Sequence, residues 1–213
     1  MDNRRTFLKK SAALTIGASA MAGVINPINS KASINPQANG INIVGPKEGY
    51  TPEIGTLVSM MNWMRNTMLR PVYGMSQKDL DYLHDDNSNS IGAMLMHLVA
   101  TERFYQKNTF EDGVHFEKGK KEDKLYDAAS DLGDAGRATF KGKELGYYLD
   151  KLEACREFSL IELAKYEDSW LEIVDTQFWG SPTNNYCKWF HVAEHESNHN
   201  GQIKYLKSRL HTT

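Results

Sequence analysis

The chain has 213 residues, of which 40% are hydrophobic and 24% charged. That length suits one domain with a substantial hydrophobic core. Its 25 basic and 27 acidic residues include no stripe of Lys and Arg of the kind that follows a phosphate backbone, which argues against nucleic acid as a partner.

The N-terminus carries a pattern typical of export. Arg4 and Arg5 precede a Phe-Leu-Lys sequence at 7–9, and a mild apolar run extends over residues 12–25. The paired arginines resemble the twin-arginine export signal, and the run is too short and too rich in Ala and Gly to span a membrane stably. The resemblance predicts a signal peptide over residues 1–32 and a periplasmic or other extracytoplasmic location. A basic N-terminus without defined structure is the alternative interpretation.

The first helix of the domain is predicted to follow a linker. Residues 33–50 contain Asn, Pro and Gly and lack a helical period, which indicates a linker or an arm. Thr51 can cap a helix that ends before Pro71. A short helical turn is expected near residues 77–83, with Ser76 as its cap. The apolar residues of the first helix recur at helical spacing: Ile54, Leu57, Val58, Met61, Met64 and Met68.

A second helix is predicted after the polar loop of residues 85–90. One face of this helix is formed by Ile91, Met94, Leu95, Leu98, Glu102 and Tyr105. The following residues, 108–143, are rich in Gly, Lys, Asp and Glu and lack a sustained period. They predict a long surface excursion with a helical turn near residues 126–132.

Two further helices complete the domain. The third is expected over residues 144–174 and the fourth over residues 183–210. No stretch has the alternating pattern of a strand. Four amphipathic helices within residues 51–213 predict an all-α fold, a four-helix bundle, in which facing side chains commonly build metal sites. Apart from the N-terminal run, no segment is apolar enough for a membrane helix, so no stable membrane span is expected.

The two cysteines are predicted to remain unpaired. Cys155 lies about 19 residues, or roughly 28 Å, before the turn between the third and fourth helices, whereas Cys187 lies just after it. A disulfide needs Cα atoms within about 7 Å. We therefore expect two buried thiols.

Three of the seven histidines lie on the fourth helix, four residues apart, at His191, His195 and His199. They share a stripe that overlaps its apolar face, where an imidazole needs a partner, either a hydrogen bond in the core or a metal ion. His195 and His199 have Cα atoms about 6 Å apart and can converge on one ion, whereas the outermost pair is too distant. His97, at the edge of the apolar face of the second helix, is the candidate third ligand. The other histidines are expected at the surface: His84, His115 and His211.

The sequence from His195 to His199 also matches H-E-x-x-H, the signature of zincin metallopeptidases. A zincin needs a third ligand after this motif. Only fourteen residues follow His199, none of them Glu, and the His-x-x-Gly-x-x-His extension is missing because Gln202 and Tyr205 occupy those positions. The peptidase interpretation is therefore disfavoured.

Residues 185–203, NYCKWFHVAEHESNHNGQI, resemble the last helix of the DinB/YfiT-like family, and residues 90–103, SIGAMLMHLVATER, resemble its second helix. Arg156 also stands where that family often has Arg. The resemblance covers about residues 53–210 and implies a divalent metal on His97, His195 and His199, the same three residues that the spacing favours. His191 is then an additional residue beside the ligands. The export signal and the 108–143 excursion are departures from better-known members.

Three imidazoles leave a metal ion with positions open to water or substrate. The first hypothesis is therefore a metal-dependent hydrolase or a thiol-dependent transferase acting on a small molecule, with Glu196 or Glu194 as a candidate base unless both carboxylates simply face solvent. The alternative is a non-catalytic metal-binding or stress-related bundle. The donor set suits zinc, nickel, iron or copper. A homodimer is compatible with exposed helix faces.

Overall fold

The computed structural model describes residues 40–111 and 124–210. The predicted signal peptide, residues 33–39 of the predicted linker, and two of the histidines, His115 and His211, lie outside these ranges. In chain order the elements are α2 (Pro52–Leu69), α3 (Gln77–Leu80), α4 (Ile91–Phe110), α5 (Lys124–Asp131), α6 (Gly133–Phe140), α7 (Leu145–Leu163), the 3-10 helix η2 (Asp168–Glu172), β1 (Val174–Asp175), the 3-10 helix η3 (Phe178–Gly180), β2 (Thr183–Asn184) and α8 (Asn185–Lys207).

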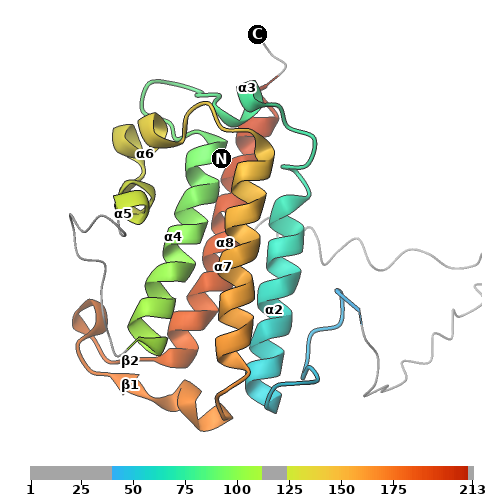
Figure 1. The fold of residues 1–213 in the computed structure, drawn as a ribbon, viewed down its shortest axis with the longest axis vertical. Coiled ribbons are helices and arrows are strands. Elements are labelled where there is room, and N and C mark those ends of the chain that lie inside the picture. Colours follow the sequence, from blue (N-terminus) through green and yellow to red (C-terminus); the bar gives the residue numbers. More distant parts are fainter. Residues whose placement is uncertain (1–39, 112–123, 211–213) are drawn as a thin grey trace, which may run out of the picture. The chain divides into compact units, whose positions relative to one another are not determined.

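Four long helices, α2, α4, α7 and α8, run side by side and form the predicted four-helix bundle (Figure 1). The expected all-α fold is confirmed. The apolar faces predicted for the first two helices supply part of the core, with Ile54, Leu57, Met61, Met68, Ile91, Met94 and Leu95. The helices α7 and α8 add Leu152, Trp189, Ile203 and Leu206. Close approach of α4 and α7 depends on Gly92, since a Cβ there would lie 2.4 Å from the hydroxyl of Tyr148.

Side-chain caps define where three of the helices begin. Ser90 accepts from the backbone N–H of Ala93 at the start of α4, and Asn184 accepts from Cys187 at the start of α8. Ser76 forms the predicted cap of α3, as part of a complete capping box. These polar residues satisfy N–H groups that a helix leaves unpaired at its first turn, which explains why the bundle helices begin at these points.

The start of α2 differs from the prediction in one respect. Thr51 occupies the N-cap position, but its side chain makes no capping hydrogen bond. Instead, Oδ1 of Asp168 accepts from the backbone N–H groups of Glu53 and Ile54 at 3.0 and 3.1 Å, and from the Thr51 hydroxyl at 2.5 Å. The α2 helix is thus capped by a residue more than a hundred positions away in the sequence.

The predicted third helix, residues 144–174, is wrong at its C-terminal end. The α7 helix ends at Leu163, and η2 follows from Asp168. A continuous helix would carry Asp168 away from the start of α2, where its carboxylate binds. The chain then forms the short antiparallel pair of β1 and β2, with Val174 opposite Asn184, although no strand was predicted.

The excursion predicted at residues 108–143 contains more regular structure than expected. The α4 helix continues to Phe110, and residues 124–140 form α5 and α6. Both short helices pack against α4, with Ala129 and Phe140 buried in the core. The backbone of this segment is tied to the loop before α4, because Gly133 N–H donates to Asn89 Oδ1 at 2.9 Å.

Four charged side chains meet inside the bundle, one from each long helix, and we call them the arginine–glutamate network. Arg65 of α2 donates to Glu102 of α4 at 2.8 Å and to Glu196 of α8 at 2.7 Å. Arg156 of α7 donates to the same two carboxylates, each at 2.8 Å. All four side chains are buried. Two positive charges balance two negative ones, and this pairing offsets the cost of removing them from water.

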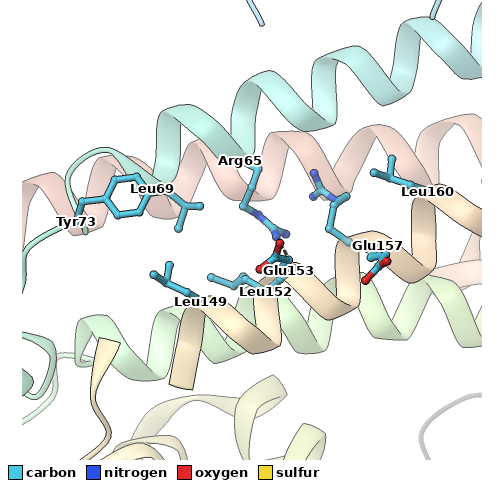
Figure 2. Close-up of a pocket in the computed structure, with 9 residues that line it drawn as sticks. Arg65, Leu69, Tyr73, Leu149, Leu152, Glu153, Glu157 and Leu160 are labelled. Carbon is cyan, nitrogen blue, oxygen red and sulfur yellow. Dashed lines mark hydrogen bonds between the residues drawn. The ribbon is translucent and has the colours of Figure 1, made fainter. Parts of the chain in front are cut away.

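A pocket of about 520 Å³ lies between α2 and α7, next to the arginine–glutamate network. Figure 2 shows Arg65 and Leu69 of α2 on one side of it and Leu149 and Leu152 of α7 on the other. Arg65 crosses to α7, where its Nη1 donates to the carbonyl oxygen of Leu152 at 2.7 Å. Arg65 therefore links α2 and α7 beside this pocket.

The cysteines form no disulfide, as expected. Cys155 is largely buried among α4 and α7, where burial raises the pKa of its thiol. Cys187, however, is exposed, because it lies on the first turn of α8. Within the described ranges, no helix is both long enough and apolar enough to cross a membrane.

Candidate metal centre

His97 lies on α4 with its ring held in one orientation. Nδ1 is 2.9 Å from the carbonyl oxygen of Ala129 on α5, and because a carbonyl oxygen only accepts, Nδ1 must donate. The neutral ring then has a lone pair on Nε2, which lies 2.8 Å from Nε2 of His195. The α5 helix, which the sequence indicated only as a helical turn, thus sets the orientation of a candidate ligand.

His195 and His199 come from successive turns of α8. Nε2 of His199 is 3.2 Å from Nε2 of His195, so the three ring nitrogens converge. The sequence-predicted triad of His97, His195 and His199 is therefore brought together, with ligand atoms within 4.8 Å of one another. His199 is buried, whereas the other two rings are partly accessible.

The donor set fits a divalent transition-metal ion. Three nitrogens bound at 2.0–2.1 Å in tetrahedral geometry would lie about 3.4 Å apart, close to the separations found here. A hydrogen bond between two of the rings would use one proton and would join only two of the three nitrogens. Nε2 of His97 carries no proton to donate, because the proton of this ring is on Nδ1. A cation between the three atoms is the arrangement that satisfies all three lone pairs. Imidazole ligands suit zinc, nickel, iron and copper, so they do not identify the metal.

The electrostatic environment keeps these rings neutral, which is the form that binds metals. Burial, together with repulsion from His199, His97 and His191, lowers the pKa of His195 to about 3. Burial, with repulsion from His97, lowers the pKa of His199 to about 4. For His97 burial also dominates and lowers the pKa, although its backbone hydrogen bond opposes the shift.

His191 lies beside the triad rather than within it. Its Nδ1 is 2.9 Å from the hydroxyl of Tyr105, and its ring centroid is 4.9 Å from that of His195. Its Nε2 lies 3.9 Å from Glu194 Oε2. His191, Glu194 and His195 form a second group with metal-binding geometry, but Glu194 is exposed and this group shares His195 with the first. The position of His191 agrees with its expected place beside the ligands.

An aromatic surface adjoins His191. Trp179 packs edge-on against the imidazole, with centroids 5.5 Å apart, and its side chain is 68% exposed. Its backbone has φ +51°, a left-handed conformation that is unfavourable for a residue other than Gly. Trp179 also lines a pocket of about 410 Å³ together with Phe104, Asp175, Gln177 and Phe178. Strained, exposed residues of this kind cluster at functional sites.

Glu196 does not face solvent and is not positioned as a free base. It is 1% exposed, and its Oε1 accepts from both Arg65 and Arg156. Neither the catalytic role considered for Glu196 nor an exposed surface role matches this position. Glu194, by contrast, is exposed as one interpretation of the sequence had it.

Sequence reasoning missed several residues around the site. Arg65 was not singled out, although it follows Met61 by four residues and so lies on the apolar face of its helix. Glu102 did appear within the apolar face of the second helix, which is the signal of a buried, paired carboxylate. Trp179 gave no such signal, because its proximity to His191 depends on the path of the loop between β1 and β2.

A helical bundle with three converging histidines on its second and last long helices defines a protein of DinB/YfiT-like type. The sequence profile of the family described as mycothiol-S-transferase matches residues 56–211, well over half of the chain, and this chain belongs to that family.

Solved structures show the same fold at low sequence identity. An uncharacterized protein from Clostridium difficile 630 is 14% identical, with a TM-score of 0.55 over 74% of this chain and 96% of its own. A protein from Streptococcus pneumoniae is 13% identical, with a TM-score of 0.56 over 74% of this chain and 91% of its own. No curated protein matches the chain significantly.

Proposed function

We propose that this protein is a metal-dependent transferase that joins a low-molecular-weight thiol to an electrophilic small molecule. The observation that carries the proposal is the convergence of Nε2 atoms from His97, His195 and His199 at a place where two of the three rings remain partly accessible. Membership in the mycothiol-S-transferase family supports the thiol as the nucleophile.

A divalent ion on three imidazoles lowers the pKa of a bound thiol or water and so supplies a nucleophile near neutral pH. In the transfer, a bond forms between the thiol sulfur and an electrophilic carbon, and the bond from that carbon to its leaving group breaks. The thiol proton leaves with that group or passes to solvent. The chain's own residues position the reactants: the Ala129 carbonyl fixes His97, and the exposed ring of Trp179 offers an apolar surface to the electrophile.

Two other functions predict different outcomes. A metal-dependent hydrolase would use water in place of the thiol and consume none. A non-catalytic metal site would be closed by a fourth protein ligand, and among the described residues no further His, Cys, Asp or Glu joins the three-histidine group. The partial exposure of His97 and His195 therefore favours an accessible, catalytic ion.

Metal content tests the site first. The full chain, purified without chelator, should contain close to one equivalent of a divalent metal by elemental analysis. Substitution of His97, His195 or His199 by Ala should abolish binding. The matched control is His191→Ala, which removes an imidazole from the same helix but should leave the metal in place. Equal loss in the control would show that the triad is assigned incorrectly.

The reaction is tested next with metal-loaded protein. We would incubate it with a low-molecular-weight thiol and an activated aryl halide, and follow thiol loss and conjugate formation by mass spectrometry. Conjugate formation that requires both the metal and His195 supports the transferase. Metal-dependent hydrolysis of an ester without thiol consumption would replace it with the hydrolase, and a bound metal without either reaction would favour a non-catalytic site.

We further propose that the protein is exported by the twin-arginine pathway, for which the support is the pattern of residues 1–32. That pathway usually carries folded proteins, so a metal acquired in the cytoplasm would remain bound during export.

A further inference from the structure

Three buried polar atoms on α8 have no hydrogen-bond partner within the described ranges. They are Oε2 of Glu196, Nδ1 of His199 and Oδ1 of Asn200. The three side chains are 1%, 5% and 6% exposed. Buried polar groups in folded proteins nearly always have a partner, so three unpartnered atoms within five residues require an explanation.

The three atoms belong to one face of the helix. Residues 196, 199 and 200 stand at positions i, i+3 and i+4, which are neighbours on an α-helical surface. This face is turned into the bundle, because Oε1 of Glu196 accepts from Arg65 and Arg156. The unpartnered Oε2 is therefore the other oxygen of a carboxylate that the arginine–glutamate network already holds in place.

Gln202 is the competing partner for His199. It lies near enough to raise the pKa of His199, against the larger lowering by burial. Its side-chain amide, however, donates to Oδ1 of Asn198 at 3.0 Å on the exposed side of α8. Nδ1 of His199 has no hydrogen bond of good geometry to Gln202. Nδ1 of His199 thus has no direct partner on either side chain, and a contact through a water is the alternative to Gln202.

The donors and acceptors match the requirements of one water molecule. If His199 binds a metal through Nε2, its Nδ1 carries the proton and is a donor, whereas Oε2 of Glu196 and Oδ1 of Asn200 are acceptors. A water molecule can donate to two oxygens and accept from one N–H at the same time. Buried waters typically make about three such bonds.

We propose that one buried water joins Glu196, His199 and Asn200, and that Glu196 is a positioning residue that orients the metal ligand His199 through this water. The inference rests on the proposed metal centre and extends it. Metal-bound histidines almost always donate their second N–H to a carboxylate, a carbonyl or a water, and this contact fixes the ring and increases its basicity. Glu196 then supports the metal centre as well as the bundle.

The chain offers a matched pair of variants for the test. Glu196→Gln removes the carboxylate that would act on His199. Glu102→Gln removes an equal charge from the same network, but both oxygens of Glu102 already have partners, on Arg65, Arg156 and Ser159. Affinity would be measured on the full-length, folded protein with Zn²⁺ against a chromophoric chelator. Co²⁺ absorption would report the geometry of the bound ion.

Glu196→Gln should weaken Zn²⁺ binding by about 10- to 100-fold and shift the Co²⁺ absorption bands, as changes beside metal ligands typically do. Glu102→Gln should leave both unchanged. Equal effects of the two substitutions would overturn the proposal, because the loss would then follow from damage to the network. A loss in Gln202→Leu instead of Glu196→Gln would assign the role to Gln202.

A second pair keeps the test decisive if Glu196→Gln does not fold. Asn200→Ala removes the other acceptor and should weaken Zn²⁺ binding severalfold, whereas Asn198→Ala, on the exposed side of α8, should not. No difference between them would refute the water-mediated contact. If the wild-type protein binds no metal, or if His195→Ala still binds it, the metal centre itself is wrong. If His195→Ala loses Zn²⁺ binding as expected, but Glu196→Gln and Asn200→Ala bind Zn²⁺ like the wild-type protein, the proposed role of Glu196 is rejected and the metal centre stands.

Discussion

Removal of one arginine from the arginine–glutamate network should destabilise the bundle strongly. Arg156→Met keeps a long, flexible side chain but removes the hydrogen bonds to Glu102 and Glu196, and the bond from Nη1 to the Met61 carbonyl at 2.9 Å. Two carboxylates then share a single guanidinium, that of Arg65, and the buried net charge becomes −1. Breaking a buried ion pair on one side typically costs about 3–5 kcal/mol, and we expect a loss in that range.

Equilibrium unfolding in urea, followed by far-UV circular dichroism, measures this loss. The matched control is Arg103→Met, which removes a pair with Glu111 at 2.6 Å whose side chains are both partly exposed. Because water screens such a pair, the control should cost only about 0.2–1 kcal/mol. If Arg156→Met costs no more than the control, the four charges are accessible to water and the reasoning about their burial is refuted.

A double variant separates lost bonds from lost charge balance. Glu102→Gln added to Arg156→Met leaves one arginine and one carboxylate, so the buried charges balance again. The double variant should be more stable than the sum of the two single losses predicts, by about 0.5–3 kcal/mol, which is the range of coupling between residues in contact. Additive losses would mean that the two side chains act independently, despite the 2.8 Å contact.

Three further predictions concern acidity, strain and export. Burial alone would raise the pKa of Glu102, but attraction to Arg156 and Arg65 outweighs it and lowers the pKa. This carboxylate therefore stabilises the fold above its unfolded pKa of about 4.3, and it loses that contribution as the pH falls through its folded pKa. The unfolding free energy should accordingly fall less steeply in acid for Glu102→Gln than for the wild-type protein. Trp179→Gly should leave the unfolding free energy unchanged or higher by up to about 1 kcal/mol, because Gly accepts a positive φ. The KM for an aromatic electrophile should rise. A stability loss above about 2 kcal/mol would show that the ring serves the fold. Replacement of Arg4 and Arg5 by Lys should retain the protein in the cytoplasmic fraction, and unchanged export would reject the twin-arginine interpretation.

Local signals in the sequence were sufficient for much of the bundle. The caps at Ser76 and Ser90, the spacing of the apolar residues and the proline after α2 define helix ends through interactions within a few residues. The histidine triad was also predictable in principle. His195 and His199 face the same way through helix geometry alone, and His97 is the remaining histidine on an apolar face.

What the sequence could not show depends on contacts between distant segments. After the end of α7, Asp168 binds at the start of α2, and this contact joins residues more than a hundred positions apart. The helices α5 and α6 have eight residues each, too few to be stable alone in water, so packing on α4 decides whether they form. Glu196 follows Val192 by four residues and so lies on the apolar face of its helix, but its partners, Arg65 and Arg156, lie on other helices and were not predictable from that spacing.

The contrast between His195 and Glu196 explains why the H-E-x-x-H motif does not specify a chemistry by itself. Consecutive residues on a helix point about 100° apart, so a histidine facing α4 places the following glutamate toward a different neighbour. In this bundle that neighbour is the pair of guanidinium groups of Arg65 and Arg156, which hold Oε1 of Glu196. The glutamate therefore balances charge inside the bundle, and its other oxygen has no hydrogen-bond partner among the described residues. The role of the glutamate in the motif therefore depends on the arginines of α2 and α7. Both helices are separated from the motif by many residues in the sequence.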